Sequence, residues 1–384
     1  MKNRLRRLFN PQVEPMNKIY IHSKNILHNF DYLQSLQSKS NIFPVLKSNA
    51  YGHWLLQMTQ ILNKTNAPYL VVDSFPEYQI VKKHSNKSIM ILWETLSKNY
   101  RKFDFSRATF CVYNIETVKY LTKLNKKIKI HLFLDTGMHR EWVNSEELLN
   151  ILEFIKNNSK SKKYKIIIEW VLSHLHSADE LDDKTNNINS QIDLFKSMYH
   201  TIIDYGHLPK RKHIWNNAGL FKIKDDFFNA YRPGLSLYGY TTLTKQDEVY
   251  NLTQKLLPAL TITSKIISLK TVKSGEWISY NHTWIASEDT QIASIPFGYF
   301  EWLPRAASNK IFFRHKKNYL PQIGSICMNL SSLEVEESKL SIWDQIEIVW
   351  LESKNSLQNL VENSDAIIYE VLVWLDSSVR REVI

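Results

Sequence analysis

The stretch IFPVLKSNAYGHW, residues 42–54, decides the expected fold. Its apolar, partly β-branched run Ile42–Leu46 predicts a buried strand. Lys47 follows at the carboxyl end of that strand, and after a polar turn the sequence WLLQMTQIL predicts a helix. A lysine at the mouth of an early parallel strand lies on the face where (β/α)8 barrels carry their chemistry. Hemmed by apolar residues, it can form a Schiff base, although a solvated lysine at a strand end is the simpler interpretation.

Strands and helices alternate on both sides of this stretch. Helical periodicity is present at residues 25–37, 54–62, 76–83, 115–124, 146–155 and 190–205. A first strand is expected at residues 17–23. Barrel strands are expected at residues 42–46, 69–72, 89–93, 109–113, 128–134, 166–175, 213–215 and 235–238. This order predicts an α/β protein whose N-terminal part is a (β/α)8 barrel of the TIM type.

After about residue 245 the pattern changes. Strand-like runs follow one another with only one short helix, expected at residues 367–375. They lie at residues 260–269, 276–280, 291–296, 323–328, 330–335 and 345–349. We therefore expect a basic N-terminal arm at residues 1–16, a barrel over residues 17–245 and a mostly-β C-terminal domain over residues 246–384.

The composition excludes several classes of protein. Two cysteines, Cys111 and Cys327, lie far apart among 384 residues, which argues against a disulfide framework and favours the reducing cytoplasm. The net charge of +11 is spread without a basic stripe, so we expect no nucleic-acid partner. The N-terminus lacks the apolar segment of a signal peptide, and no run reaches the ~18 apolar residues of a membrane span. No membrane association is expected.

The string KSNAYGH closely resembles the cofactor-binding segment of the alanine racemases, fold-type III enzymes that use pyridoxal 5′-phosphate (PLP). In that family the lysine of this string carries the cofactor, so the resemblance implies this role for Lys47. Further motifs resemble the family in the same order: LFLDTGMHREW, SHLHSADE, WNNAGL, YRPGLSLYG, EWISYNHTW, IPFGYFEWLPR and IGSICMNL. The resemblance implies a PLP-dependent racemase that interconverts L-alanine and D-alanine and thereby supplies a peptidoglycan precursor.

The same resemblance implies which residues hold the cofactor. Arg232 would face the pyridine nitrogen, and His174 would stack on the ring. Arg140 would face the phenolic oxygen of the cofactor and the substrate carboxylate, a task that suits a guanidinium because it stays charged and presents several fixed donors. The phosphate would be bound by side chains or backbone N–H groups of Tyr51, Asn217, Gly234, Leu235 and Tyr369.

The β-domain would supply the rest of the site. Tyr280 matches the family's second catalytic base, which acts opposite Lys47 on the other face of the substrate bound to the cofactor. Met328 matches the residue whose backbone meets the substrate carboxylate, and Tyr299 matches a residue at the substrate entrance. In the family the tyrosine comes from a partner subunit, so the resemblance implies a homodimer with composite active sites.

The chain departs from the family pattern at several positions. Phe133 stands where the family usually has a carbamylated lysine that orients the arginine. Glu301 and Trp302 replace an aspartate and a glycine, and Asn329 replaces an aspartate. Asn281 replaces a glycine, and VRREV replaces the family's V-P-R near the C-terminus. These departures leave a non-catalytic or weakly active PLP-binding homologue as an alternative.

A second alternative is a metal-dependent barrel hydrolase. His174 and His176 point to the same side of an expected strand, and an H-x-H pair can bind a metal. No later cluster of histidine and aspartate ligands accompanies the pair, so we expect no metal site.

Overall fold

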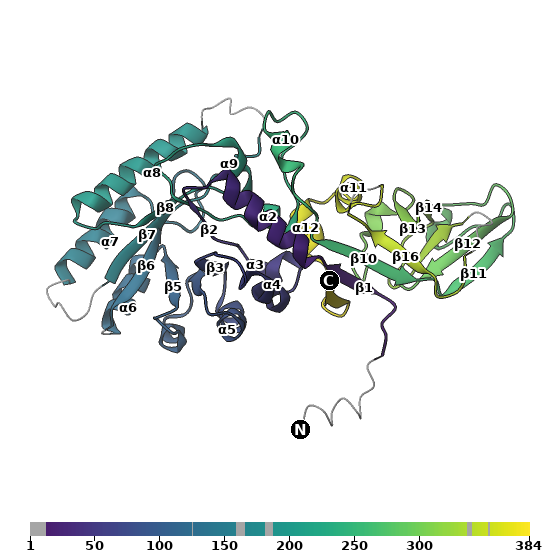
Figure 1. Cartoon of the computed structure of the whole chain (residues 1–384), viewed down its shortest axis with the longest axis horizontal. Helices are drawn as coiled ribbons and strands as arrows, with labels where there is room; N and C mark the ends of the chain where they lie inside the picture. Colours follow the sequence, from purple (N-terminus) through teal and green to yellow (C-terminus); the bar gives the residue numbers. More distant parts are fainter. Residues whose placement is uncertain (1–12, 125, 159–165, 181–186, 336–339, 352–353) are drawn as a thin grey trace, which may run out of the picture. The chain divides into compact units, whose positions relative to one another are not determined.

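The computed structural model describes residues 13–124, 126–158, 166–180, 187–335, 340–351 and 354–384. The chain divides into two compact units (Figure 1). One unit comprises Ser23–Pro258, and the other comprises Met1–His22 together with Ala259–Ile384. The division therefore differs from the expected one at both ends of the barrel. Residues 1–12 of the expected N-terminal arm lie outside the described residues.

The core of the Ser23–Pro258 unit is a curled parallel sheet. In the described part of the chain it has six strands in the order β3–β4–β5–β6–β7–β8. Nearly every residue of these strands is buried, as expected for parallel strands covered on both faces. The strands are β3 (Tyr69–Val72), β4 (Ser88–Ile91), β5 (Ala108–Val112), β6 (Ile128–Phe133), β7 (Ile166–Leu172) and β8 (Arg211–His213).

A parallel pair, β2 (Asn41–Ile42) and β9 (Ala230–Tyr231), closes this sheet into a ring. On one side the N–H of Leu46, just after β2, donates to the carbonyl of Val71 in β3 at 2.7 Å. On the other side the N–H of Asn229, just before β9, donates to the carbonyl of Lys212 in β8 at 3.1 Å. The expected barrel is confirmed.

The expected eighth strand at residues 235–238 is wrong. Those residues form a 3₁₀ turn, η2 (Leu235–Tyr238), and the eighth strand is the shorter β9 upstream. Pro233 has no N–H to donate to a ladder, and Gly234 adopts φ −109° and ψ −83°, which turns the chain out of the strand direction. The apolar run LSLY is nevertheless fully buried, so its hydrophobicity reported burial rather than strand geometry.

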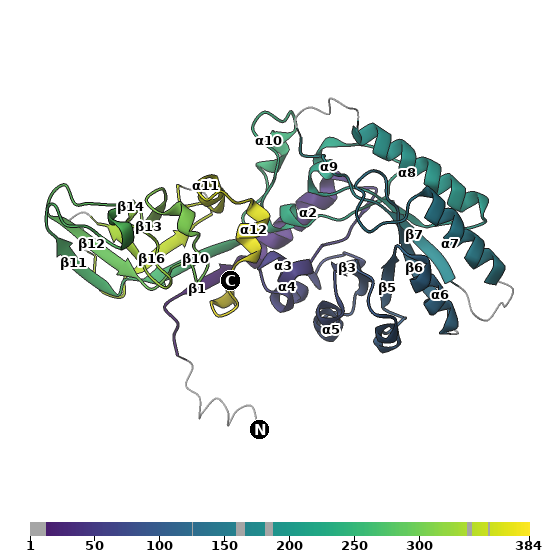
Figure 2. The same ribbon diagram turned by 180° about the vertical axis from the view of Figure 1, so that it is seen from behind.

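Helices pack around the ring with one apolar face inward. In α7, for example, Leu148, Ile151, Leu152 and Ile155 are buried at helical spacing. Figures 1 and 2 show α6, α7 and α8 side by side outside the sheet. The described helices of this unit are α2 (Ser23–Leu36), α3 (Lys47–Tyr51), α4 (Leu55–Leu62), α5 (Phe75–His84), η1 (Ser97–Lys102), α6 (Ile115–Lys123), α7 (Ser145–Asn158), α8 (Asn187–Asp204), α9 (Asn217–Lys222) and α10 (Tyr250–Thr253).

The second unit is a mostly-β structure, as predicted. Its described strands form one sheet in the order β11–β12–β15–β14–β13–β16–β10–β1–β17. They are β1 (Lys18–Ile21), β10 (Leu260–Lys265), β11 (Ser268–Val272), β12 (Thr290–Ile295), β13 (Phe312–His315), β14 (Asn318–Ile323), β15 (Ser331–Glu334), β16 (Gln345–Val349) and β17 (Arg380–Val383). Its helices and turns are η3 (Tyr280–His282), η4 (Arg305–Ala307), α11 (Leu357–Glu362) and α12 (Ile368–Val373).

Strand β1 belongs to this sheet and not to the barrel. It pairs antiparallel with β10 and parallel with β17, and these partners lie more than 200 residues away in sequence. Two expected strands, at residues 276–280 and 323–328, are loops and a 3₁₀ turn instead. Left-handed residues break them, with φ of 66° at Ser279, 62° at Asn281 and 70° at Gly324.

No helix within the described ranges is long and apolar enough to cross a membrane.

Candidate active site

Lys47 follows Leu46, whose N–H donates to the carbonyl of Val71 in β3, and it begins a left-handed turn. Ser48, Asn49 and Ala50 all have φ of 54–55° and ψ of 43–51°. Such a conformation costs about 1–2 kcal/mol per residue for side chains other than glycine. Strain of this kind persists only where the surrounding structure over-determines it, and it clusters at functional sites.

Hydrogen bonds from neighbouring elements hold this turn. The Asn49 N–H donates to Glu77 Oε1 at 2.9 Å, and Asn49 Oδ1 accepts from the N–H of Leu55 at 2.9 Å. Glu77 is itself unusual, because burial and a hydrogen bond to Asp73 raise the pKa of its carboxyl to about 7. Sequence analysis missed this acidic pair, since neither residue stands out from an ordinary helix start.

Charged groups surround the Lys47 amine. Burial lowers the pKa of Lys47, and the nearby charges of Arg140 and Arg232 lower it further, whereas Asp73 and Glu141 oppose the shift. A lowered pKa increases the unprotonated fraction of the amine, which is the form that attacks a carbonyl. Lys47 thus has the environment of a reactive amine rather than that of a solvated one.

Arg232 is held in the barrel interior. It is 7% exposed, its Nη2 donates to the carbonyl of Ser173 at 2.6 Å, and its Nη1 donates to the carbonyl of His213 at 3.1 Å and contacts His213 Nδ1. Burial lowers the pKa of Arg232 to about 10, so the guanidinium remains charged at neutral pH. His213, which sequence analysis assigned only to a strand, is its fixed partner.

His174 lies at the same end of the barrel, just after β7. Burial and then the charges of Arg232, Arg140 and Lys47 lower the pKa of its imidazole to about 3. The ring is therefore neutral at physiological pH. The structure thus brings together four of the residues singled out from sequence: Lys47, Arg140, His174 and Arg232.

A second group of expected residues meets around Gly234. Asn217 Oδ1 accepts from the N–H groups of Gly234 and Ser236, both at 3.0 Å. A Cβ atom on Gly234 would lie 2.3 Å from the hydroxyl oxygen of Tyr51, so only glycine allows this approach. Leu235 follows at the start of η2 and is fully buried.

The same cradle contains a hydroxyl that sequence analysis did not single out. Ser236 Oγ is buried and lacks a hydrogen-bond partner among the described residues. A buried polar atom of this kind calls for an explanation, such as a ligand that supplies the missing partner. A small anion that accepts a hydrogen bond from the Ser236 hydroxyl would be such a ligand.

Arg140 lies on the loop between β6 and α7. Its guanidinium carbon lies 4.5 Å from the ring centre of Trp142, and its Nε lies 3.1 Å from Glu141 Oε2. Trp142 stacks on Phe133 with ring centres 4.1 Å apart. Sequence analysis noted Phe133 as a departure, but it did not single out Trp142.

The remaining expected residues lie in the second unit, on connected loops. Tyr280 is 66% exposed, Met328 is 55% exposed and Tyr299 is 44% exposed. The Tyr299 N–H donates to the carbonyl of Cys327 at 3.0 Å, and Ser325 Oγ donates to the carbonyl of Tyr280 at 2.9 Å. These bonds link the loops that carry all three residues.

Tyr369 lies on α12 of the same unit. Trp302 Nε1 donates to the carbonyl of Val371 in that helix, which ties α12 to the loop after Tyr299. Trp302 therefore has a structural task of its own and is only 3% exposed.

Two departures from the family pattern match each other. Asn329 Nδ2 donates to Glu301 Oε1 at 2.9 Å, and Glu301 Oε2 accepts from the N–H of Gly298 at 2.8 Å. A carboxylate at position 329 would repel Glu301 instead of donating to it. The amide and the longer carboxylate thus form a consistent pair.

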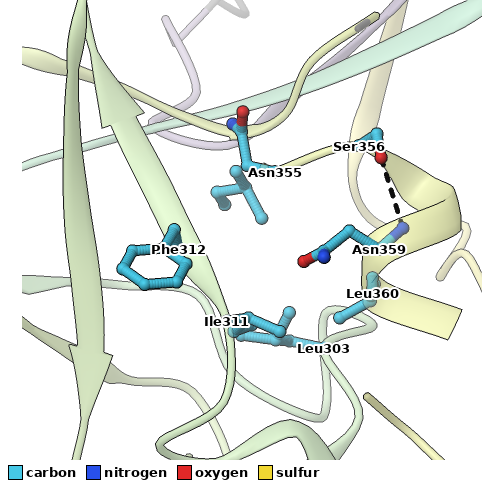
Figure 3. Close-up of a pocket in the computed structure, with 8 residues that line it drawn as sticks. Leu303, Ile311, Phe312, Asn355, Ser356, Asn359 and Leu360 are labelled. Carbon is cyan, nitrogen blue, oxygen red and sulfur yellow. Dashed lines mark hydrogen bonds between the residues drawn. The ribbon is translucent and has the colours of Figure 1, made fainter. Parts of the chain in front are cut away.

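Two other features give no site. Among the described residues, no group of three or more histidine, cysteine, aspartate or glutamate side chains could hold a metal ion, so the hydrolase hypothesis gains no support. A cavity in the C-terminal unit has a volume of about 10 Å³, which is room for about one water molecule. Figure 3 shows the residues that line it. It is lined by Leu303, Ile311, Phe312, Ile348, Asn355, Ser356, Asn359 and Leu360.

Both units match models of known protein families. The family model described as alanine racemase, N-terminal domain, matches residues 21–242, and the model described as alanine racemase, C-terminal domain, matches residues 259–383. The second match begins at residue 259, where the C-terminal part of the second unit begins, whereas the first match ends at residue 242, before the barrel unit ends at Pro258.

Similar proteins cover nearly the whole chain. The alanine racemase of Borreliella burgdorferi (strain ZS7) is 30% identical, over 98% of this chain and 99% of its own. The alanine racemase of Vesicomyosocius okutanii is 28% identical, over 94% of this chain and 97% of its own.

Solved structures agree in fold. The crystal structure of alanine racemase from D-cycloserine producing Streptomyces lavendulae superposes with a TM-score of 0.88 at 21% identity, covering 97% of this chain and 98% of that one. The alanine racemase from E. faecalis gives a TM-score of 0.86 at 22% identity, covering 96% of this chain and 98% of that one.

Proposed function

Because the chain belongs to the alanine racemase family, we propose that it uses PLP to interconvert L-alanine and D-alanine. The observation that carries the proposal is the position of Lys47. Lys47 follows Leu46, which is hydrogen-bonded to Val71 in β3, and burial together with the charges of Arg140 and Arg232 lowers the pKa of its amine. Both arginines are in the motifs that resemble the family. The cytoplasmic location expected from the two distant cysteines is part of the same proposal.

The residues present fit PLP. A phosphate group would supply a partner for the Ser236 hydroxyl in the cradle formed by Tyr51, Asn217 and Gly234. We assign the phosphate to this cradle, and the family resemblance adds Leu235 and Tyr369 as further phosphate-binding residues. Arg232 would face the pyridine nitrogen, and the neutral ring of His174 would stack on the cofactor.

When bound, PLP would acidify the α-hydrogen of the amino acid. The chain's own residues then decide where the proton goes. Lys47, with its lowered pKa, would remove the proton from one face of the substrate in one direction of the reaction. In the reverse direction it would add a proton to the same face. Tyr280 would hold the proton on the other face at its hydroxyl oxygen. Racemisation needs two such groups on opposite faces, or one that moves.

The two arginines would have separate tasks. Arg232 stays charged, so it can donate a hydrogen bond to the pyridine nitrogen but, unlike a carboxylic acid, does not readily give up a proton. This favours proton return over side reactions such as transamination. Arg140 would bind the substrate carboxylate, assisted by the backbone at Met328, with Tyr299 at the entrance.

We further propose a head-to-tail homodimer in which Tyr280, Met328 and Tyr299 complete the site of the partner chain. An exposed apolar group on the C-terminal unit supports this. Trp277 and Phe300 are 55% and 54% exposed on the loops that carry Tyr280 and Tyr299. Large exposed apolar side chains that gather in one region often mark an interaction surface.

The alternative is a PLP-binding homologue with little or no activity. Phe133 favours it, because a phenyl ring cannot carry the charge of the carbamylated lysine that the family usually has at this position. A product assay separates the two functions. The purified protein with PLP should convert L-alanine to D-alanine, measured by chiral chromatography, and Lys39→Ala, at an 85% exposed side chain, is the neutral control.

Bound PLP without D-alanine would favour the inactive homologue. A protein that neither binds PLP nor forms D-alanine would overturn both functions.

A further inference from the structure

The loop that carries Arg140 is fixed at its base. The N–H of Asp135 donates to the carbonyl of Val143 at 2.7 Å, and the N–H of Val143 donates to the carbonyl of Phe133 at 2.9 Å. Asp135 Oδ1 accepts from the N–H groups of the three residues 137–139 at 2.9–3.1 Å. The backbone at residue 140 is therefore well defined, whereas the Arg140 side chain is 51% exposed and needs a separate support.

The ion pair with Glu141 is a weak support. The two side chains are 51% and 35% exposed, and exposed pairs between neighbouring residues are screened by water and salt. The indole of Trp142 is a better candidate, because it is 4% exposed and lies 4.5 Å from the guanidinium carbon. Attraction between a cation and an aromatic ring increases where water is excluded.

Phe133 fixes the indole in turn. It is 6% exposed, ends β6, and stacks on Trp142 with an angle of 10° between the ring planes. Phe133, Trp142 and Arg140 thus form a layered group from the barrel strand to the site. The indole also lies 6.3 Å from the His174 ring, at the end of the barrel where Lys47 lies.

Simple core packing does not explain the tryptophan. Trp142 Nε1 is buried and has no hydrogen-bond partner among the described residues. A buried donor without a partner is unfavourable, and phenylalanine or leucine would fill the space without that penalty. The large π face of the indole is the property that only tryptophan provides in full.

We propose that Trp142, backed by Phe133, is a positioning residue that holds the Arg140 guanidinium over its ring toward the substrate carboxylate. The carboxylate part of this inference depends on the proposed function. The stack itself does not. The aromatic pair takes the orienting task without adding any charge to the site.

The first test needs no catalytic activity. Phenylglyoxal modifies accessible guanidinium groups, and peptide mapping by mass spectrometry reports the rate at each arginine. In Trp142→Leu the rate at Arg140 should rise about 10-fold, the change that corresponds to losing a partly desolvated cation–π contact. Trp142→Phe keeps an aromatic face, so it should give a smaller rise and provides the test if the leucine variant does not fold.

The chain offers a reciprocal control in the second unit. The Arg314 guanidinium carbon lies 4.6 Å from the ring centre of Trp350. Trp350→Leu should raise modification at Arg314 and leave Arg140 unchanged, whereas Trp142→Leu should do the opposite. Equal rates at Arg140 in the wild type and in both Trp142 variants would overturn the proposal.

The second test uses the holoenzyme. Trp142→Leu should raise KM for alanine about 10-fold with a smaller effect on kcat, because the carboxylate contact exists before the reaction as well as during it. In an Arg140→Gln background the same substitution should have no further effect, since Trp142 acts through Arg140. Additive effects would mean that Trp142 is only a packing residue. A wild type that forms no D-alanine would contradict the proposed function. The rates of modification at Arg140 would still show whether Trp142 holds the guanidinium.

Discussion

The two units hold their candidate site residues in opposite ways. In the barrel, Arg232 and Asn217 are 7% and 8% exposed and are bonded to neighbouring elements. In the C-terminal unit, Tyr280 and Met328 are 66% and 55% exposed. The barrel fold therefore pre-organises most of the residues we assign to the cofactor, with Tyr369 as the exception. The residues we assign to the second base and the substrate project from loops, where they can meet a partner.

The two units also accommodate their departures from the family pattern in different ways. In the barrel, Phe133 is buried in a stack with Trp142, so a lost charge is replaced by packing. In the C-terminal unit, Asn329 donates a hydrogen bond to Glu301, at two positions where the family pattern has aspartates. Each departure is locally consistent, which argues against a degraded site.

The largest expected effect comes from the barrel half. Lys47→Ala should reduce racemisation by at least ~10³-fold, because it removes both the cofactor anchor and an acid–base group. The visible absorbance band of enzyme-bound PLP should disappear, while circular dichroism should show an unchanged fold. A variant that keeps the band would assign the cofactor to another lysine, which borohydride reduction and peptide mapping would identify.

The next effect concerns the turn behind Lys47. The folded protein holds a proton on Glu77 up to about pH 7, whereas the unfolded chain releases it near the ordinary value of 4.5. The folded state thus binds more protons in this window, and the free energy of unfolding should fall as pH rises from 4.5 to 7. Glu77→Gln keeps an acceptor for the Asn49 N–H and removes this dependence.

Urea unfolding of both proteins across this pH range gives the measurement. The difference in free energy between them should change by about 1–2 kcal/mol, since solvent screens part of the full effect. His174 titrates with the opposite sign, because its lowered pKa makes the folded state bind fewer protons below pH 6.5. The contribution of His174 is the same in the wild type and in Glu77→Gln, so it cancels when the two proteins are compared. If the difference in the free energy of unfolding between the two proteins does not change with pH, the raised pKa of Glu77 beside Asp73 is refuted.

A smaller effect is expected in the C-terminal unit. Asn329→Asp should destabilise it by about 0.5–1 kcal/mol, because a hydrogen bond is lost and two partly exposed carboxylates then repel each other. Adding Glu301→Gln should restore the stability, since a donor and an acceptor again face each other. The urea midpoints of the single and double variants check this. A double variant with a lower urea midpoint than either single variant would rule out the pairing of Asn329 with Glu301.

The last prediction is that carbon dioxide has no effect on the activity. The barrel departure places a phenyl ring at position 133, which has no amine that could react with carbon dioxide. Activity should therefore be the same in carbon-dioxide-free buffer and in buffer with added bicarbonate. An activity that rises with bicarbonate would mean that a lysine elsewhere is carbamylated and supports the site.

Much of the architecture followed from periodicity in the sequence. Strands such as β3 and β16 and the helices α2, α4, α5, α6, α7 and α8 appear close to where apolar spacing predicted them, whereas the short helices α3, α9 and α10 were not predicted. A strand was predicted at the position of β1, but its place in the sheet of the second unit was not, because its partners β10 and β17 are distant in sequence. The run at residues 235–238 was misassigned because burial gives the same apolar signal in a strand and in a 3₁₀ turn.

The site was predictable where a short string carries it, as around Lys47. The supporting residues were not. Glu77 and His213 act through Asn49 and Arg232, which only the fold brings close to them. Trp142 gave one weak signal, since it follows Arg140 by two residues. The left-handed turn at residues 48–50 had no signal beyond the tolerance of asparagine for that conformation.

The most direct test of the central claim measures the two substrate faces separately in Tyr280→Phe. The variant loses only the hydroxyl of a 66% exposed ring, so the fold and the PLP band should persist. Racemisation should fall by about 10²–10⁴-fold, the usual worth of a positioned acid–base group. The family resemblance assigns D-alanine to the lysine and L-alanine to the tyrosine. With Lys47 intact, the α-hydrogen of D-alanine should therefore still exchange with deuterium from solvent, and that of L-alanine should exchange far more slowly. Equal losses of exchange for both enantiomers would contradict two bases on opposite faces.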